Sequence, residues 1–216
     1  MPIQSTLPVE VIENIIDNTS GDRQTLWNLC LCCHTLRTRC RIHLFERIRI
    51  KTRKQMLSTS DFLDARTWLP PLIRHVTICT AAGIVPIALF TRLPNLRSWK
   101  FAGDFGAQLE ESRILILHQH ALSGFRHYGI NIISLSISFF NFTNCAELGR
   151  LLLTFPNIQE LSCLGRLRVN SDVPGSSDVL LLHRLTRRLQ IRRLTVSLIV
   201  VLCFASLSRQ SHSLTY

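Results

Sequence analysis

One apolar pattern recurs along the chain and constrains its fold more than any other feature. It consists of an apolar residue, two variable residues, a second apolar residue, one variable residue and a third apolar residue. The five copies begin and end at Ile73 and Ile78, Leu96 and Phe101, Ile132 and Ile137, Ile158 and Cys163, and Ile191 and Val196. The alternation at the end of each copy is typical of a strand with one buried face. A repeated strand of this kind predicts a stack of similar units.

The stretches between the copies favour helices, so the chain is expected to alternate strand and helix. Apolar residues at helical spacing occur over 84–93 and 107–125, and Asn144 is suited to cap a third helix. The copies resemble the strand segment of leucine-rich repeats, and two of the spacings between copies, 23 and 26 residues, fall within the range of that family. The other two spacings, 36 and 33 residues, imply insertions or degenerate repeats. The resemblance implies an irregular α/β solenoid with strands on one side and helices on the other.

The strand-lined face of such a solenoid is where a partner protein would bind. Several variable positions expected on this face are basic, which predicts an acidic target. The candidate target-binding residues are Arg74, Arg97, Lys100, Arg192 and Arg193. The other variable positions expected there are His75, Ser98, Ser134, Ser136, Gln159 and Glu160.

The stretch before this array predicts a separate unit of three short helices. Pro8 suits a helix start, Glu10 suits a first helical turn, and Asp22 can cap the second helix. That second helix is expected to carry Leu26, Leu29 and Cys33 on one face and Trp27 and Leu31 on a neighbouring face. So small a unit cannot bury every apolar face, and the surplus is left for a partner or for the rest of the chain.

The order of residues in this stretch carries a second resemblance. Leu7-Pro8-x-Glu10-Val11-Ile12 and the segments Leu26–Cys33 and Arg39–Phe45 together resemble the F-box, in the form common among F-box-like proteins of basidiomycete fungi. The resemblance implies that the three helices bind the small Skp-type adaptor of a cullin–RING ubiquitin ligase. The adaptor contacts that it implies are Leu7, Pro8, Val11, Ile12, Ile15, Leu26, Leu29 and Cys33. The family usually has Trp where this chain has Leu36, and Arg or Lys where it has His34, which implies a repacked or weaker adaptor interface.

Length and composition give the expected organisation of the chain. Its 216 residues are expected to form an F-box-like helical domain over 1–50, a linker helix over 51–72 and a repeat region over 73–216. The apolar run at 198–207 is short for a membrane span, so a buried strand is expected there, with a membrane anchor as the alternative. No polar cap follows this run, so the repeat array is expected to be truncated there.

Charge and cysteine content bear on the partners and the compartment. The 25 Lys and Arg residues exceed the 14 Asp and Glu residues, which gives a net charge of +11. Because the basic residues are spread along the chain and do not alternate with aromatic residues, nucleic-acid binding is not expected. The eight cysteines come without a secretory signal sequence, which indicates reduced thiols in an intracellular protein of the cytoplasm or nucleus.

No catalytic residue, cofactor site or metal site is predicted. The possible metal ligands that lie close together in the sequence are Cys30, Cys32, Cys33, His34, Cys40 and His43. Their spacing does not match that of paired zinc ligands, so the small thiols are expected to be buried in an apolar environment instead. The sequence thus favours a substrate-recognition subunit of a Skp–cullin–F-box ubiquitin ligase, which raises the effective concentration of a target protein beside the ligase. The alternative is a non-catalytic interaction scaffold in which the first helices only cap the solenoid.

Overall fold

The computed structural model describes residues 7–79, 87–102, 119–138, 141–142, 145–164, 168–169 and 189–196. The chain divides into two compact units, Met1–Ile48 and Arg49–Tyr216, and each is described by itself. The predictions made for the apolar run at 198–207 lie outside the described residues.

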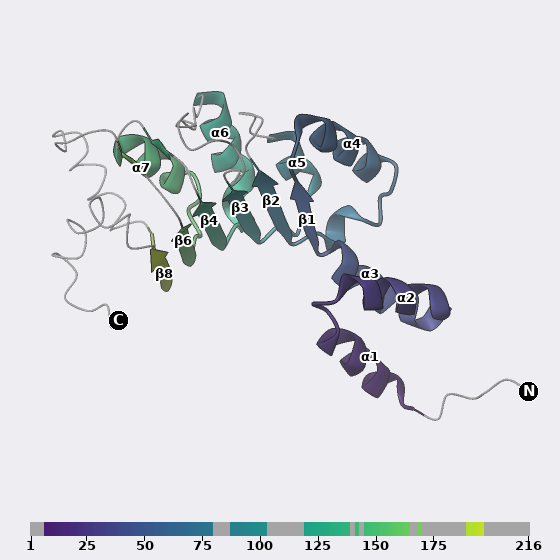
Figure 1. The fold of residues 1–216 in the computed structure, drawn as a ribbon. Helices are drawn as coiled ribbons and strands as arrows, with labels where there is room; N and C mark the ends of the chain where they lie inside the picture. The colour runs from purple at the N-terminus through teal and green to yellow at the C-terminus, as the bar shows by residue number, and fades with distance from the viewer. Residues whose placement is uncertain are drawn as a thin grey trace, which may run out of the picture. The chain divides into compact units, whose positions relative to one another are not determined.

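The first unit consists of the three expected helices, α1 (Val9–Asn18), α2 (Arg23–Cys32) and α3 (His34–Phe45) (Figure 1). The predicted cap of α2 is confirmed, because Oδ1 of Asp22 accepts hydrogen bonds from the backbone N–H groups of Gln24 and Thr25, at 3.0 and 3.2 Å. Pro8 is the residue just before α1 rather than its first helical residue, and Glu10 lies in the first turn as expected.

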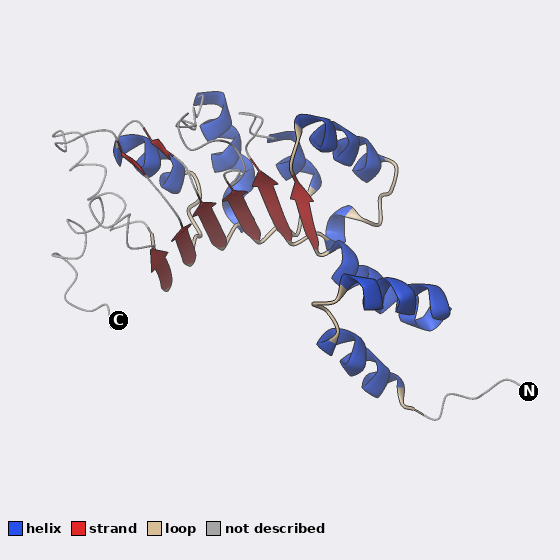
Figure 2. Cartoon of the chain, in the orientation of Figure 1, coloured by secondary structure: helices blue, strands red, loops and turns tan. Residues whose placement is uncertain are grey.

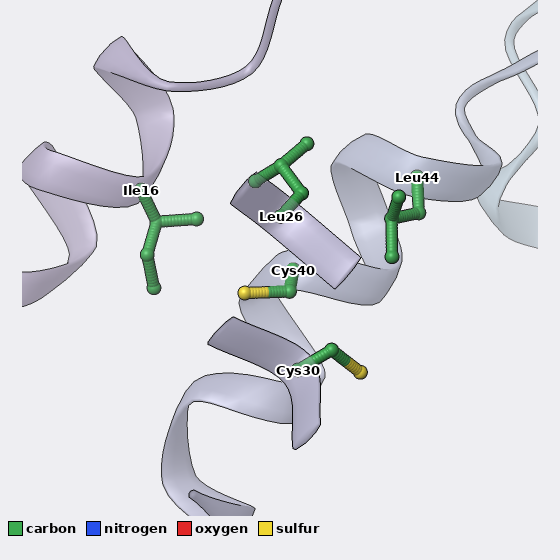
Figure 3. Close-up of a cluster of buried hydrophobic side chains, with 5 residues drawn as sticks. All are labelled: Ile16, Leu26, Cys30, Cys40 and Leu44. Atoms are coloured by element: carbon green, nitrogen blue, oxygen red, sulfur yellow. The ribbon is translucent and has the colours of Figure 1, made fainter. Parts of the chain in front are cut away.

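The three helices of this unit share a small apolar core (Figure 3). The buried side chains of this core are Ile16, Leu26, Cys30, Cys40 and Leu44. Four further apolar side chains pack against them and are partly buried, namely Ile12, Leu29, Leu36 and Phe45. Each helix supplies at least one buried residue, so each one is held by tertiary packing and not by helix propensity alone.

The second unit is built on a six-stranded parallel sheet, so the mixed α/β class is confirmed (Figure 2). The strands, in their order across the sheet, are β1 (Arg47–Ile50), β2 (His75–Cys79), β3 (Ser98–Ala102), β4 (Ser134–Ser138), β6 (Glu160–Leu164) and β8 (Arg193–Val196). Two short strands, β5 (Asn141–Phe142) and β7 (Arg168–Val169), form a separate parallel pair. The boundary between the two units falls inside β1.

The pairing register of the sheet matches the alignment of the five apolar patterns. The central apolar residues of the copies are Val76, Trp99, Leu135, Leu161 and Leu194, and each is the register partner of the next. The last apolar residues, from Ile78 to Val196, pair in the same way. The prediction that these five segments are equivalent strands is therefore confirmed.

Helices lie on one side of the sheet (Figure 2). They are α4 (Arg53–Asp64), α5 (Ile87–Arg92), α6 (Gln119–Tyr128) and α7 (Cys145–Leu153), and two 3-10 turns, η1 (Pro70–Leu72) and η2 (Gly129–Asn131), precede β2 and β4. The helices predicted at 84–93, at 107–125 and from Asn144 are confirmed over 87–92, 119–125 and 145–153. Residues 84–86, 107–118 and 144 lie outside the described part of the chain. The helix expected as a linker is α4, which belongs to the second unit, where Asp64 pairs with Arg92 of α5.

Aromatic side chains fill the space between the helices and the sheet. Trp99 on β3 is fully buried and stacks on Phe90 of α5, with ring centroids 4.1 Å apart. Phe125 of α6 lies between Phe90 and Phe155, at centroid distances of 5.2 and 5.3 Å. Such large buried rings supply much of the apolar area that a small sheet needs for stability.

Three asparagines each link one strand–helix unit to the unit before it. The side-chain Nδ2 of Asn95 donates to the carbonyl of Pro71 at 2.8 Å, and that of Asn157 donates to the carbonyl of Ile130 at 2.8 Å. Asn131 makes the equivalent bond to Pro94 at 3.3 Å. Each asparagine directly precedes the first apolar residue of its copy, so the hydrogen bonds recur with the same period as the strands.

Candidate interaction surfaces

The helix α1 has two apolar stripes that face in different directions. Ile12 and Ile16, four residues apart, pack into the core of the first unit. Val11 and Ile15 repeat at the same spacing and are exposed by 41% and 48%, and Leu7, two residues before α1 begins, is exposed by 52%. A helix of a monomeric domain normally exposes polar residues opposite its core face, so this second stripe is a candidate contact surface.

The helix α2 repeats this arrangement. Leu26 and Cys30 are buried in the core, while Trp27 and Leu31, each one residue further along the helix, are exposed by 49% and 68%. An exposed Trp beside an exposed Leu is unusual on a soluble surface and typical of interface anchors. Both helices therefore present an apolar stripe away from the core of their own unit.

The structure separates the predicted adaptor contacts into two groups. Leu7, Pro8, Val11 and Ile15 are exposed on or beside α1, as a contact requires. Leu26 is fully buried, and Ile12 and Leu29 pack partly buried against the core, so these three residues support the unit from inside. Val9, Trp27 and Leu31 are not among the predicted contacts, although all three are exposed apolar residues of α1 and α2.

The placement of Cys33 on the face of Leu26 and Leu29 is wrong. The helix α2 ends at Cys32, and Cys33 has an extended backbone, with φ −148° and ψ 140°, at the start of α3. Its side chain is exposed, and its Sγ lies 2.7 Å from the hydroxyl of Thr35. That hydroxyl, with the backbone N–H groups of Thr35 and Leu36, lowers the pKa of the Cys33 thiol.

An ionic cluster joins α1 to α3 and was not foreseen from the sequence. Asp17 accepts hydrogen bonds from Nε and Nη2 of Arg39, at 2.7 and 2.5 Å, and its Oδ1 lies 2.8 Å from Nε2 of His43. The hydrogen bonds from Arg39 and then from His43 hold the pKa of the Asp17 carboxyl well below its usual range. The cluster links α1, which carries the exposed residues Val11 and Ile15, to α3.

The side of the sheet opposite the helices, here called the open face, is polar. On each strand the residues of this face alternate with the buried apolar residues. They are His75 and Thr77 on β2, Ser98 and Lys100 on β3, Ser134 and Ser136 on β4, Glu160 and Ser162 on β6, and Arg193 and Thr195 on β8. All of these side chains are half-buried except Arg193 and Thr195, which are exposed.

The predicted target-binding residues lie on or beside this face. Lys100 and Arg193 belong to its strands, and Arg74, Arg97 and Arg192 precede β2, β3 and β8 and are exposed. Arg193 forms an ion pair with Glu160 on the neighbouring strand, 3.0 Å from Nη1 to Oε1.

The cysteines of the first unit point to separate places. Cys30 and Cys40 lie in the core, and Cys32 and Cys33 are exposed. Within the described residues, no three His, Cys, Asp or Glu side chains gather in a way that could hold a metal ion. None of the helices in the described part of the chain combines the length and hydropathy needed to cross a membrane.

Comparison of the chain with protein-family models, with curated proteins and with solved structures finds no match in any of the three.

Proposed function

We propose that this chain is a substrate-recognition subunit of a Skp–cullin–F-box type of ubiquitin ligase. The first unit would bind the Skp-type adaptor, and the second, a leucine-rich-repeat-like solenoid, would bind a target protein. The chain itself performs no chemistry in this proposal. It raises the effective concentration of the target near the ligase, and the transfer of ubiquitin is then a consequence of proximity.

The observation that carries the proposal is the pair of exposed apolar stripes on the first unit. The unit already has a core of its own, and yet Val11, Ile15, Trp27 and Leu31 remain between 41% and 68% exposed. Apolar side chains of this size on a unit of three short helices are expected to be covered by a partner. They follow the Leu-Pro-x-Glu start on which the resemblance to the F-box depends.

The repeated geometry of the second unit supports the solenoid part of the proposal. Five strands pair in parallel with no shift of register between the copies. The carbonyls of Arg74, Arg97, Ile133 and Gln159 each accept two backbone hydrogen bonds from the following copy. Contact of each unit with its neighbours through the same hydrogen bonds is the defining property of a repeat protein.

The direct test is co-expression of residues 1–216 with a fungal Skp-type adaptor, followed by affinity capture and size-exclusion chromatography. A complex of one adaptor with one copy of this chain is expected. Folded chain that elutes alone in the presence of adaptor would contradict the proposal and would favour the scaffold, in which the helices only cap the array.

Variants on the exposed stripes make this test specific. Val11→Asp and Leu31→Asp should abolish the complex, because each places a carboxylate in an apolar interface, while the fold should survive because both positions point away from the core. Leu57→Asp, at a leucine on α4 of the second unit whose exposed fraction of 56% lies between those of Val11 and Leu31, is the matched control and should leave the complex intact. Substitutions at Ile12 or Leu29 are less informative, because both side chains pack against the core.

A further inference from the structure

We infer that the edge of the sheet at which the strands begin binds an amphipathic helix of the target protein, with acidic residues beside its apolar stripe. The inference rests on the proposed function, since it names the kind of segment by which the second unit would hold its target. The residues that would make the contact, here called the rim, occupy one equivalent position, two residues before the first apolar residue of each of the first four copies. They are Pro71, Pro94, Ile130 and Pro156.

The rim is an exposed row of apolar side chains. All four of its residues are exposed, and the exposed fraction of Ile130 is 53%. Tyr128, two residues before Ile130, is exposed by 40%. Because the strands pair in parallel with no shift of register, equivalent positions of successive copies lie side by side, at about the strand spacing of 4.8 Å. A row of exposed apolar side chains with a tyrosine beside it is typical of a contact surface.

The backbone of the rim already has hydrogen-bond partners within the chain. The carbonyls of Pro71, Pro94 and Ile130 accept the hydrogen bonds from the asparagines that link successive copies. Proline has no N–H group, so three of the four rim residues carry no backbone donor. A partner can therefore cover the rim without leaving these groups unpaired, which reduces the free-energy cost of removing water from it.

The same hydrogen bonds favour a helix as the partner. An extended segment presents backbone groups that need partners, and the rim has prolines and occupied carbonyls where those partners would be. A helix satisfies its backbone internally, and its turns are about 5.4 Å apart, close to the spacing of the copies. Side chains on one face of an extended segment are about 6.7 Å apart. Apolar side chains one turn apart on a helix can therefore pack between successive rim residues, and about three turns span the rim.

The charges close to the rim favour acidic residues on that helix. Residues 65–102 and 119–146, which contain the first three rim positions, include no Asp or Glu. Arg97 and Arg126 lie three and four residues from a rim position, are exposed, and form no ion pair within the part of the chain that the structure describes. Carboxylates beside the apolar stripe of the partner would complement these guanidinium groups.

A second copy of this chain fits the rim less well. Its net charge of +11 would bring further positive charge toward Arg97 and Arg126. A single row of side chains also covers less than the roughly 800 Å² per partner of a stable dimer interface. The rim is thus suited to a short segment of a different, acidic protein.

The test is fluorescence anisotropy of the full chain with a labelled synthetic peptide of about twelve residues, which as a helix has Leu once per turn and Glu on the flanking positions. Saturable binding is expected. A peptide of the same composition in scrambled order has no apolar stripe and should bind about tenfold more weakly or worse.

Variants of the chain locate the binding site. Ile130→Asp should weaken binding of the first peptide by about tenfold or more, because it places a carboxylate among apolar side chains. Pro94→Asp, one copy earlier, should act in the same way. Leu164→Asp is the matched control, at an exposed leucine where β6 ends, and should alter binding by less than about threefold because it lies at the opposite end of the strands.

Several results would overturn the inference. They are absence of peptide binding by the folded wild-type chain, equal binding of the two peptides, and equal losses in Ile130→Asp and Leu164→Asp. Dimerisation of the wild type that Ile130→Asp abolishes, measured by sedimentation velocity, would assign the rim to a second copy instead. Adaptor binding is measured on the same samples and should be unchanged in every variant. A chain that binds the peptide but not the adaptor would refute the proposed ligase role alone, and a chain that binds only the adaptor would refute the rim site alone.

Discussion

Arg39 binds the carboxylate of Asp17 through two hydrogen bonds, from Nε to Oδ1 and from Nη2 to Oδ2, and so ties α3 to α1. His43, one turn further along α3, lies within 2.8 Å of the same carboxylate. Ile12 and Ile16 supply the apolar contact of α1 with the core, and this ionic cluster adds a polar contact between α1 and α3.

The cluster predicts a specific dependence of stability on pH. Because the folded-state pKa of Asp17 is lowered, its contribution to stability is present above the ordinary carboxyl pKa of about 3.9 and is lost as the pH falls below that value. Asp17→Asn should lower the melting temperature at pH 7 and should remove this part of the acid sensitivity. Thermal melts of both proteins between about pH 2 and pH 7 would measure the difference.

Asp61→Asn, at an exposed position of α4, is the control for that experiment. It should leave the acid-dependent loss of stability unchanged. An Asp17→Asn variant with the same pH profile as the wild type would show that the ion pair adds nothing to the stability of the first unit.

The asparagines that connect successive copies should contribute unequally to stability. Asn95→Ala and Asn157→Ala each remove a 2.8 Å hydrogen bond to a backbone carbonyl and should lower the free energy of unfolding by about 1 kcal/mol. Asn131→Ala removes a longer bond of 3.3 Å and should cost less. Urea denaturation of the three variants measures the free energy of unfolding. A larger loss of stability for Asn131→Ala than for the other two variants would contradict the prediction.

Gly129 is required by close packing in η2, the 3-10 turn before β4. A Cβ atom at this position would lie 2.7 and 2.8 Å from two ring atoms of Phe155, and the ring of Phe155 is fully buried. Gly129→Ala should therefore lower the free energy of unfolding by about 1–3 kcal/mol, the range typical of overpacking.

Gly21 offers the control for this substitution, because a Cβ atom there would have no neighbour within 4 Å. Gly21→Ala should change stability by less than about 0.5 kcal/mol. If Gly129→Ala were equally harmless, the ring of Phe155 would have to be free to move, in conflict with its burial.

The strands were the most predictable part of this chain. Their apolar spacing alone aligned Val76 with Trp99, Leu135, Leu161 and Leu194, and the observed register agrees. The reason is physical, since a strand in a sheet with one covered face must alternate buried and polar residues. The cap at Asp22 was predictable for a similar reason, because the hydrogen bonds that it forms are local in sequence.

The candidate surfaces were less predictable. Cys33 was placed on a helix face because its spacing continued from Leu26 and Leu29, but the helix ends one residue before it. Which apolar stripe of α1 faces the core depends on where α3 lies, and both stripes have the same spacing in the sequence. The sequence therefore grouped Ile12 with Val11, although only Ile12 packs against the core.

The sequence by itself determined the mixed α/β class, the five equivalent strands and the three helices at the start, because each depends on periodicity or on a local hydrogen bond. Only the tertiary structure decided that Trp27 and Leu31 lie outside the core of the first unit, that Asp17 meets Arg39, and that Glu160 pairs with Arg193. These partners are separated by 22 and 33 residues in the chain. Side chains so far apart meet only when packing brings their elements together, and no local pattern encodes that meeting.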